Sequence, residues 1–193
     1  MELFRERGYD QTTAAEIAAR AGVTERTFFR YFPDKREVLF DGEVGMLAAL
    51  SAAIADAPDN LGPMDVLLRT FRSFEKTIEK NRPFNEPRQA IIAVTPALRE
   101  RQLLKSAAMA VVVASALEKR GVERKMAALT AQAGVAVFDH AGRAWFEDPS
   151  LSLGEHMKRA FQALHGLAAQ NAKPRSRTAS RSRTASARPK RHK

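Results

Sequence analysis

Thr24, Glu25, Arg26 and Thr27 form a short polar run whose side chains can bind nucleic acid. Arg26 carries a guanidinium fork that can donate two hydrogen bonds to the edge of a guanine, a contact that discriminates between bases by roughly 1–3 kcal/mol. Thr27 can contact a base edge as well, and Thr24 can bind a phosphate oxygen. The run therefore offers base reading anchored on a phosphate.

Tyr31 and Lys35, later in the chain, can bind the phosphate backbone. Such contacts position a protein on DNA without reading its sequence. Glu25 and Arg30 suit either a base contact or a phosphate contact. Thr13 is included among the predicted DNA-binding residues. We predict that these residues form a DNA-binding surface. A generic helical hairpin with a solvated basic face would have the same spacing, so the spacing alone leaves both interpretations open.

Two short helices joined by a tight turn must position these residues. Thr13 is a suitable N-cap, and Glu16 three residues later completes a capping box, which predicts that a first helix begins here. Gly22 supplies the left-handed backbone that ends this helix. Thr24 then caps a second helix that runs to about Tyr31.

The second helix has two different faces. Phe28 and Phe32 are four residues apart and share one face, which can pack, while the basic residues lie on another face, which can meet a partner. A proline follows. Asp34 is expected to cap a third helix, with Glu37 at the capping-box position.

The segment from Phe4 to Phe40 resembles the N-terminal domain of the tetracycline-repressor (TetR) family of bacterial regulators. The matching elements are Gly8-Tyr9, Thr12-Thr13, Glu16-Ile17-Ala18, Ala21-Gly22-Val23, Thr27, Tyr31-Phe32 and Lys35. The resemblance implies an all-α fold with an N-terminal helix-turn-helix domain, residues 1–45, and a larger helical effector-binding and dimerisation domain, residues 46–172. It also implies an Ω-shaped homodimer.

Two features depart from the family pattern. Family members usually have further residues before the position of Met1, which form most of the first helix, and here Met1–Arg7 stands for it. Either this helix is truncated or the start codon is misassigned. Phe29 stands where the family often has a tyrosine whose hydroxyl contacts a phosphate. Phe29 is carried over as a DNA-contacting position without that hydrogen bond, because its ring has no hydroxyl.

The net charge of +10 is concentrated at the C-terminus. Residues 173–193 hold nine of the 32 Lys and Arg residues and no acid, which leaves 23 basic against 22 acidic residues elsewhere. This tail repeats Ser-Arg-Thr-Ala-Ser, has no large apolar residue and is predicted to be disordered. It can bind polyanions without sequence preference. Its composition resembles the basic extensions of some bacterial nucleoid proteins, and together with the absence of cysteine this leads us to expect a cytoplasmic, nucleoid-associated bacterial protein. A solubilising extension is the alternative.

Apolar residues in the middle of the chain predict buried helices and a candidate cavity for an unknown small apolar effector. The segment Ala107 to Leu117 is apolar on all sides, as in helices buried on several sides. Core and pocket-lining residues look alike in a sequence, so plain core packing stays open for each candidate. The candidate pocket residues are Phe71, Phe74, Ile91, Met109, Val112 and Phe138.

Two later helices have narrow apolar seams with small residues, which suit close helix packing. Such a pair from each of two subunits would form a four-helix bundle, and the homodimer would bind double-stranded DNA at an inverted-repeat operator. The seams could instead close the core of one chain. The candidate interface residues are Met126, Leu129, Ala133, Ala136 and His140 in the first helix and Met157, Ala160 and Leu164 in the second.

No pattern in the sequence indicates catalysis, a metal or a cofactor. Asp139 and His140 are adjacent, so on a helix their side chains diverge by about 100° and do not form an acid–base pair. The chain has no cysteine, which excludes disulfides and thiolate metal sites. No apolar run has the length of a membrane span, and the start MELFRERG is too charged for a signal peptide.

The sequence thus predicts a sequence-specific DNA-binding transcriptional regulator, and the resemblance implies a repressor released by a small-molecule effector. One alternative is an architectural DNA-binding protein dominated by its basic tail. Another is a small-molecule-binding dimer that has lost DNA binding through its short N-terminus.

Overall fold

The computed structural model describes residues 1–41 and 43–172, which contain helices and no strand, so the predicted all-α fold is confirmed. The predicted disordered tail, 173–193, lies outside the described residues. The helices are α1 (Glu2–Arg7), α2 (Ala14–Arg20), α3 (Glu25–Tyr31), α4 (Glu43–Ala55), α5 (Pro63–Ser73), α6 (Glu75–Lys80), α7 (Arg82–Val94), α8 (Pro96–Lys119), α9 (Arg124–Glu147) and α10 (Leu153–Ala172).

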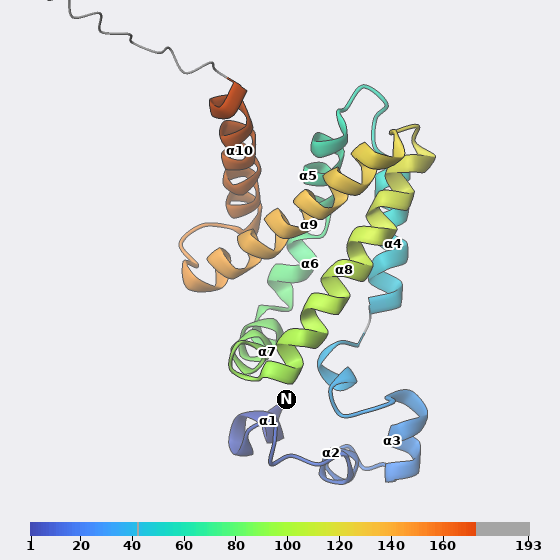
Figure 1. Cartoon of the computed structure of the whole chain (residues 1–193). Helices are drawn as coiled ribbons and strands as arrows, with labels where there is room; N and C mark the ends of the chain where they lie inside the picture. The colour runs from blue at the N-terminus through green and yellow to red at the C-terminus, as the bar shows by residue number, and fades with distance from the viewer. Residues whose placement is uncertain (42, 173–193) are drawn as a thin grey trace, which may run out of the picture.

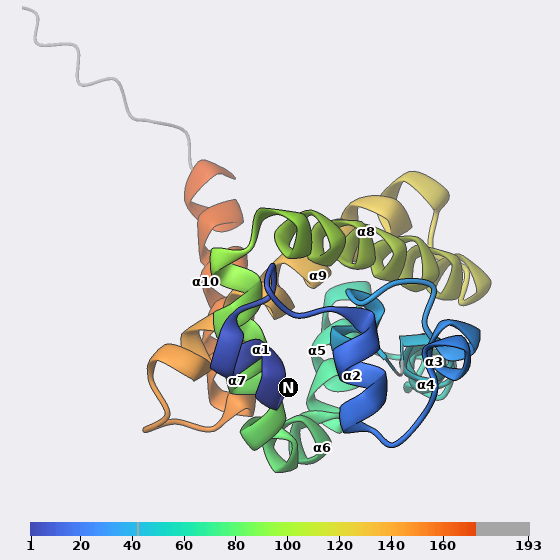
Figure 2. The same cartoon turned by 90° about the horizontal axis from the view of Figure 1, so that it is seen from below.

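The first three helices lie together at one end of the molecule (Figure 1), and α1 lies beside α7 (Figure 2). Their predicted caps are confirmed. Thr13 accepts a hydrogen bond from the Glu16 amide at 3.2 Å, and the Glu16 carboxylate accepts from the Thr13 amide at 2.9 Å. Gly22 has a left-handed φ of 69°, and Thr24 caps α3 by accepting from the Thr27 amide at 3.1 Å.

The prediction that a third helix begins at Asp34 is wrong. The chain makes a single 3₁₀ turn, Glu37–Leu39, before α4 begins. The Asp34 carboxylate accepts from both the amide and the guanidinium of Arg36 at 2.7 Å, which closes a local turn. Glu37 does not reach back to a cap, because its carboxylate pairs with Arg101 of α8, the shorter N–O distance being 2.6 Å.

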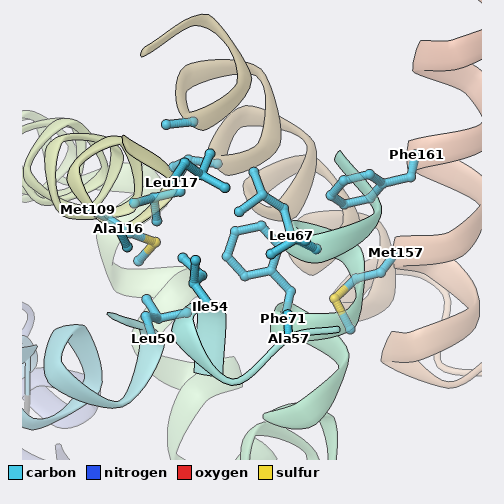
Figure 3. Packing of buried hydrophobic residues seen from close by; sticks show 14 of the residues in the cluster. Leu50, Ile54, Ala57, Leu67, Phe71, Met109, Ala116, Leu117, Met157 and Phe161 are labelled. Carbon is cyan, nitrogen blue, oxygen red and sulfur yellow. The ribbon is translucent and has the colours of Figure 1, made fainter. Parts of the chain in front are cut away.

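The main core lies between α4, α5, α8, α9 and α10. Leu67 and Phe71 of α5 are at its centre, 0% and 1% exposed, with Ile54 of α4 on one side and Phe161 of α10 on the other (Figure 3). The long helices α8 and α9 pack against each other, and α10 packs against α9. The most deeply buried side chains of the larger part thus come from helices distant in sequence.

A second, smaller core joins the first three helices to the larger part. Phe4 of α1 and Leu39 and Phe40 of the following segment pack with Ile92 of α7 and Leu98 of α8, and all five are at most 5% exposed. This cluster therefore contains residues of the N-terminal part, residues 1–41, and residues of α7 and α8. The orientation of the N-terminal helices is therefore set in part by α7 and α8.

Two glycines of α9 offer a matched test of this packing. A methyl group at Gly134 would overlap Cδ1 of Leu67, which is fully buried, whereas one at Gly142 would meet nothing within 4 Å. Gly142→Ala is expected to raise the free energy of unfolding by about 0.5–1 kcal/mol, because alanine favours a helix. Gly134→Ala is expected to lower it by about 1–2 kcal/mol, because overpacking outweighs the same gain.

Urea denaturation followed by circular dichroism measures both variants. Equal stabilisation by the two alanines would contradict the prediction, because it would mean that the Leu67 side chain can move away without cost.

Candidate nucleic-acid interface and effector cavity

The exposed face of α3 carries most of the predicted DNA-contacting residues. Glu25, Arg26, Arg30 and Tyr31 are exposed, while Phe28 behind them is 4% exposed and packs on Phe32 with ring centroids 5.4 Å apart. Buried Phe28 fixes α3 against the domain. Its polar face is thereby presented to solvent as a unit.

Arg26 is the side chain best placed to read a base. Among the residues that the structure describes, it forms no hydrogen bond and no ion pair. Arg30, by contrast, lies over the ring of its neighbour Tyr31, with 4.9 Å between the guanidinium carbon and the ring centroid, and donates to the Tyr31 hydroxyl at 3.2 Å. Arg26 therefore keeps all its donors for a partner.

The remaining predicted residues of this surface have structural contacts as well. The Thr24 and Thr27 hydroxyls lie 3.0 Å apart at the cap of α3, and the Thr13 hydroxyl is engaged with Glu16 at the cap of α2. Phe29 is 47% exposed and meets Phe28 edge-on. The hydroxyls of these threonines are therefore already engaged in helix caps, and a DNA contact would be made in addition to the cap.

Lys35 has a structural role that the sequence did not predict. Its ammonium donates to the carbonyl oxygens of Tyr9 at 2.8 Å, Thr12 at 2.9 Å and Asp10 at 3.4 Å, and lies 4.3 Å from the centroid of the Tyr9 ring. An ammonium has three donors. The predicted phosphate contact of Lys35 is thus left without a free donor, and the side chain instead holds the loop between α1 and α2.

Thr12, one of the positions that match the family pattern, has a structural role that the sequence did not predict. It is fully buried, and its hydroxyl donates to the Gly8 carbonyl at 2.8 Å, with the Leu3 carbonyl at 3.3 Å. A buried threonine beside a helix start is not distinguishable from an exposed one by local sequence. The contact ties the end of α1 to the start of α2.

An apolar cavity of about 420 Å³ lies inside the larger part of the chain. Four of the six predicted pocket residues line it, namely Phe71, Phe74, Met109 and Phe138. The rings of Phe71 and Phe138 stack with centroids 4.7 Å apart and form one wall. A cavity of this size and lining suits a small apolar ligand.

The other two predicted pocket residues lie elsewhere. Ile91 packs against the small core around Phe4 and Ile92, so it supports the junction with the N-terminal helices. Val112 is half-buried on α8 and does not line the cavity. The prediction is wrong for both, because apolar residues on a helix give no indication of which hollow they face.

A polar compartment of about 210 Å³ adjoins the apolar cavity. The two share Asp41, Met46, Asn85 and Met109 in their linings. The polar compartment adds two cationic side chains, Arg88 of α7 and Lys105 of α8, and the neutral side chains of Gln102 and Ser106. The combined space has an apolar body and a charged end, where Arg88 and Lys105 lie with the Asp41 carboxylate.

Arg88 is a largely buried cation in the lining of this compartment. Burial lowers the pKa of its guanidinium to about 10, so the group stays charged at neutral pH. It donates to the Leu39 carbonyl and, at 3.4 Å, to Gln102, and it forms no ion pair within the described ranges. Nearby, burial raises the pKa of Asp139, which accepts a hydrogen bond from Ser106 at 2.8 Å.

A larger hollow of about 740 Å³ lies on the outer side of α4 and α5. Half of the residues that line it are charged, namely Asp56, Asp65, Arg69, Arg72 and Glu75. Apolar surface and enclosure are what bind a small apolar molecule. The smaller cavity lined by Phe71 and Phe138 is therefore the better candidate for a small apolar ligand.

The predicted dimer seam on α9 is exposed. Met126 and Leu129 are 51% and 61% exposed, Ala136 and His140 are exposed, and Ala133 is half-buried. Large apolar side chains in a row on a surface indicate a contact with another molecule. This face remains the proposed subunit interface.

The predicted seam on α10 is wrong in part. Met157 is fully buried in the main core of its own chain, and Ala160 packs against that core. Leu164, one turn further, is half-buried. The same spacing of apolar residues serves packing within the chain here, because periodicity defines a face of a helix and not its partner.

Two classes of site have no counterpart in the described part of the chain. No group of three His, Asp or Glu side chains there could hold a metal ion. No helix there is long and apolar enough to cross a membrane.

Two family models match the chain. Residues 1–41 match the model described as bacterial regulatory proteins, tetR family, and residues 61–168 match the MftR C-terminal domain. The first match covers α1 to α3, and the second covers α5 to α9 and most of α10.

Individual proteins are similar as well. The protein named MftR of Mycobacterium tuberculosis is 25% identical over 171 residues, 85% of this chain and 84% of that protein. The HTH-type transcriptional regulator TcmR of Streptomyces glaucescens is 36% identical over 73 residues, 38% of this chain and 32% of that one. The crystal structure of FadR from Thermus thermophilus, a transcriptional repressor in complex with lauroyl-CoA, superposes with a TM-score of 0.55 at 26% identity, covering 86% and 89% of the two chains.

Proposed function

Since this chain belongs to the TetR family of bacterial regulatory proteins and is a DNA-binding transcriptional regulator, we propose that it is a homodimeric repressor that a small amphipathic effector releases from its operator. The observation that carries this proposal is the pairing of an exposed, polar α3 with a largely apolar cavity in the same chain.

In this proposal Arg26 and Thr27 contact base edges, because they lie in the first turns of α3, where recognition helices meet bases. Thr24 and Tyr31 contact phosphates, with Glu25, Arg30, Phe29 and Thr13 at the edge of the same surface. The roles differ in kind: base contacts specify the sequence, and phosphate contacts fix the position.

A two-fold dimer through the exposed face of α9 would present two copies of α3 to one side of a duplex. Recognition helices of such dimers enter successive major grooves about 34–36 Å apart. The operator is then an inverted repeat. Its half-site spacing reports the distance between the two reading helices.

The effector is proposed to place an apolar body against the wall formed by Phe71, Phe74 and Phe138. An acyl chain has this form, and the similar FadR protein was crystallised with lauroyl-CoA. Binding would favour a dimer whose reading helices no longer match the groove spacing, which is a shift in population between two states.

Recovery of genomic DNA fragments by the full chain, followed by footprinting, tests the proposal. We expect a two-fold symmetric protected site that is retained at physiological salt. Absence of any retained fragment even at low salt would favour the alternative in which the chain binds a small molecule and no longer DNA.

Deletion of residues 173–193 separates the specific regulator from an architectural protein. The nine basic residues of this segment are expected to contribute to affinity for any DNA, so the deletion should reduce the slope of log K against log salt by about 0.9 for each phosphate that they neutralise. Protection of the symmetric site should persist. Loss of all binding in the deletion variant, with no effect of Arg26→Ala, would favour the architectural alternative.

A further inference from the structure

The segment that connects the N-terminal helices to α4 is held by cationic side chains of the polar compartment. We define residues 37–41 as the connector. Arg88 donates to the carbonyl of Leu39, and the Lys105 ammonium lies 3.6 Å from the Glu37 carboxylate and 3.5 Å from the Phe40 carbonyl. The cations that face the cavity therefore also hold the connector.

The aromatic ring of the connector lies against the same two cations. Phe40 is 5% exposed, with the Arg88 guanidinium carbon 4.9 Å and the Lys105 nitrogen 5.2 Å from its ring centroid. Leu39 and Phe40 belong to the small core that contains Phe4 of α1. A displacement of either cation is thus transmitted directly to the residues that seat the N-terminal helices.

The contacts of Arg88 are neutral ones. Its guanidinium has five donors in a planar fork, and its acceptors are a backbone carbonyl and the amide oxygen of Gln102. A carboxylate or phosphate binds such a fork with shorter and stronger hydrogen bonds than a neutral carbonyl does. An anion that enters the polar compartment can therefore compete for Arg88.

We propose that an anionic group of the effector binds Arg88 and Lys105 and draws them from the connector, which loosens the seat of the DNA-reading helices. The inference rests on the proposed function and names the chemistry of its effector: an apolar chain that ends in a carboxylate or a phosphate. Arg101 keeps its two hydrogen bonds to Glu37, at 2.6 and 3.0 Å, so the connector is loosened and not detached.

The anion has two possible sources, the carboxylate of a fatty acid and the phosphates of an acyl-CoA. Dodecanoate, dodecanol and lauroyl-CoA, below their micelle-forming concentrations, separate these sources from the contribution of the chain alone. Calorimetry of the full chain measures binding of each probe. Fluorescence anisotropy with the selected operator measures release from DNA.

For the wild-type chain we expect dodecanoate, lauroyl-CoA or both to bind and to release DNA, and dodecanol not to release it. Arg88→Met is expected to bind the active anion roughly tenfold to a hundredfold more weakly in calorimetry. Because the substitution also removes one hold on the connector, its operator affinity without anion should fall, so its release by anion is compared with its own anion-free binding. Arg88→Lys keeps the charge without the fork and should lie between the two. Arg99→Met removes an equal charge from the exposed face of α8 and serves as the matched control.

Glu37→Gln tests the connector itself. Without the carboxylate the connector is held less firmly, and Lys105 loses an ion pair that competes with the anion. The anion concentration that releases half of the DNA should therefore fall several-fold, and anion binding measured without DNA should tighten.

The inference is overturned if neither anion binds the wild-type chain, if dodecanol releases DNA as dodecanoate does, or if Arg88→Met responds at wild-type concentrations. Failure of the proposed function has a different signature, since a wild-type chain that retains no operator can still bind anions through Arg88 in calorimetry.

Discussion

Arg26→Ala is expected to abolish selective binding to the operator while the protein remains folded. Each bidentate contact between an arginine and a guanine discriminates by roughly 1–3 kcal/mol, and a dimer has two, so the specific complex should lose about 2–6 kcal/mol, or at least about thirtyfold in affinity. Because Arg26 is exposed and has no partner in the described part of the chain, its removal costs the fold nothing that the structure shows.

Anisotropy titrations with the operator and with a random duplex measure this effect. Arg99→Ala, which removes the same charge from an exposed position on α8, is the control and should bind the operator as the wild type does. If Arg26→Ala weakened binding to both duplexes equally, Arg26 would be a phosphate contact and base reading would have to come from elsewhere on α3.

Lys35→Met is expected to destabilise the N-terminal helices rather than to weaken a DNA contact. The substitution keeps an apolar stem against Tyr9 and removes the donors to the carbonyls of Tyr9, Asp10 and Thr12. Hydrogen bonds from a charged group contribute about 1.5–3 kcal/mol, and a cation over an aromatic ring about 0.5–1 kcal/mol, so the loss should be about 2–4 kcal/mol.

Hydrogen exchange of the amides in α1 and α2 reports this loss, with Lys76→Met on the exposed side of α6 as the control. A phosphate contact would behave differently. In that case protection would be unchanged, and the log–log salt slope of DNA binding would fall by about 0.9 for each subunit.

Local hydrogen bonds are what the sequence predicted well. The capping box of Thr13 and Glu16, the left-handed Gly22 and the cap at Thr24 each involve residues within three or four positions of one another. Such contacts depend on residue type and spacing, which a sequence displays. The reading helix and its orientation on Phe28 followed from them.

Long-range competition is what the sequence could not display. Glu37 has the spacing of a capping-box residue after Asp34, but Arg101 lies 64 positions away and offers two charged hydrogen bonds. A local cap contributes about 1 kcal/mol and is outweighed by such a pair when the two helices meet. The ion pair between Glu37 and Arg101 therefore could not be predicted from the sequence.

The two seams of the last helices make the same point for packing. Met126 on α9 and Met157 on α10 occupy equivalent places in nearly identical patterns, yet one is 51% exposed and the other is fully buried. Periodicity gives the apolar face. Which neighbour covers it depends on the crossing of α10 with α9, to which residues far apart in sequence contribute.

The small core shared by α1, the connector and α7 limits how far the DNA-reading end can be treated as an interchangeable module. Ile92 and Leu98 are 4% and 0% exposed because Phe4, Leu39 and Phe40 cover them. A chimera that grafted residues 1–41 onto another regulator would leave both halves of this core without their complement. Exchanging operator preference between such proteins therefore calls for moving the α7 surface together with the reading helices, or for altering the exposed face of α3 alone.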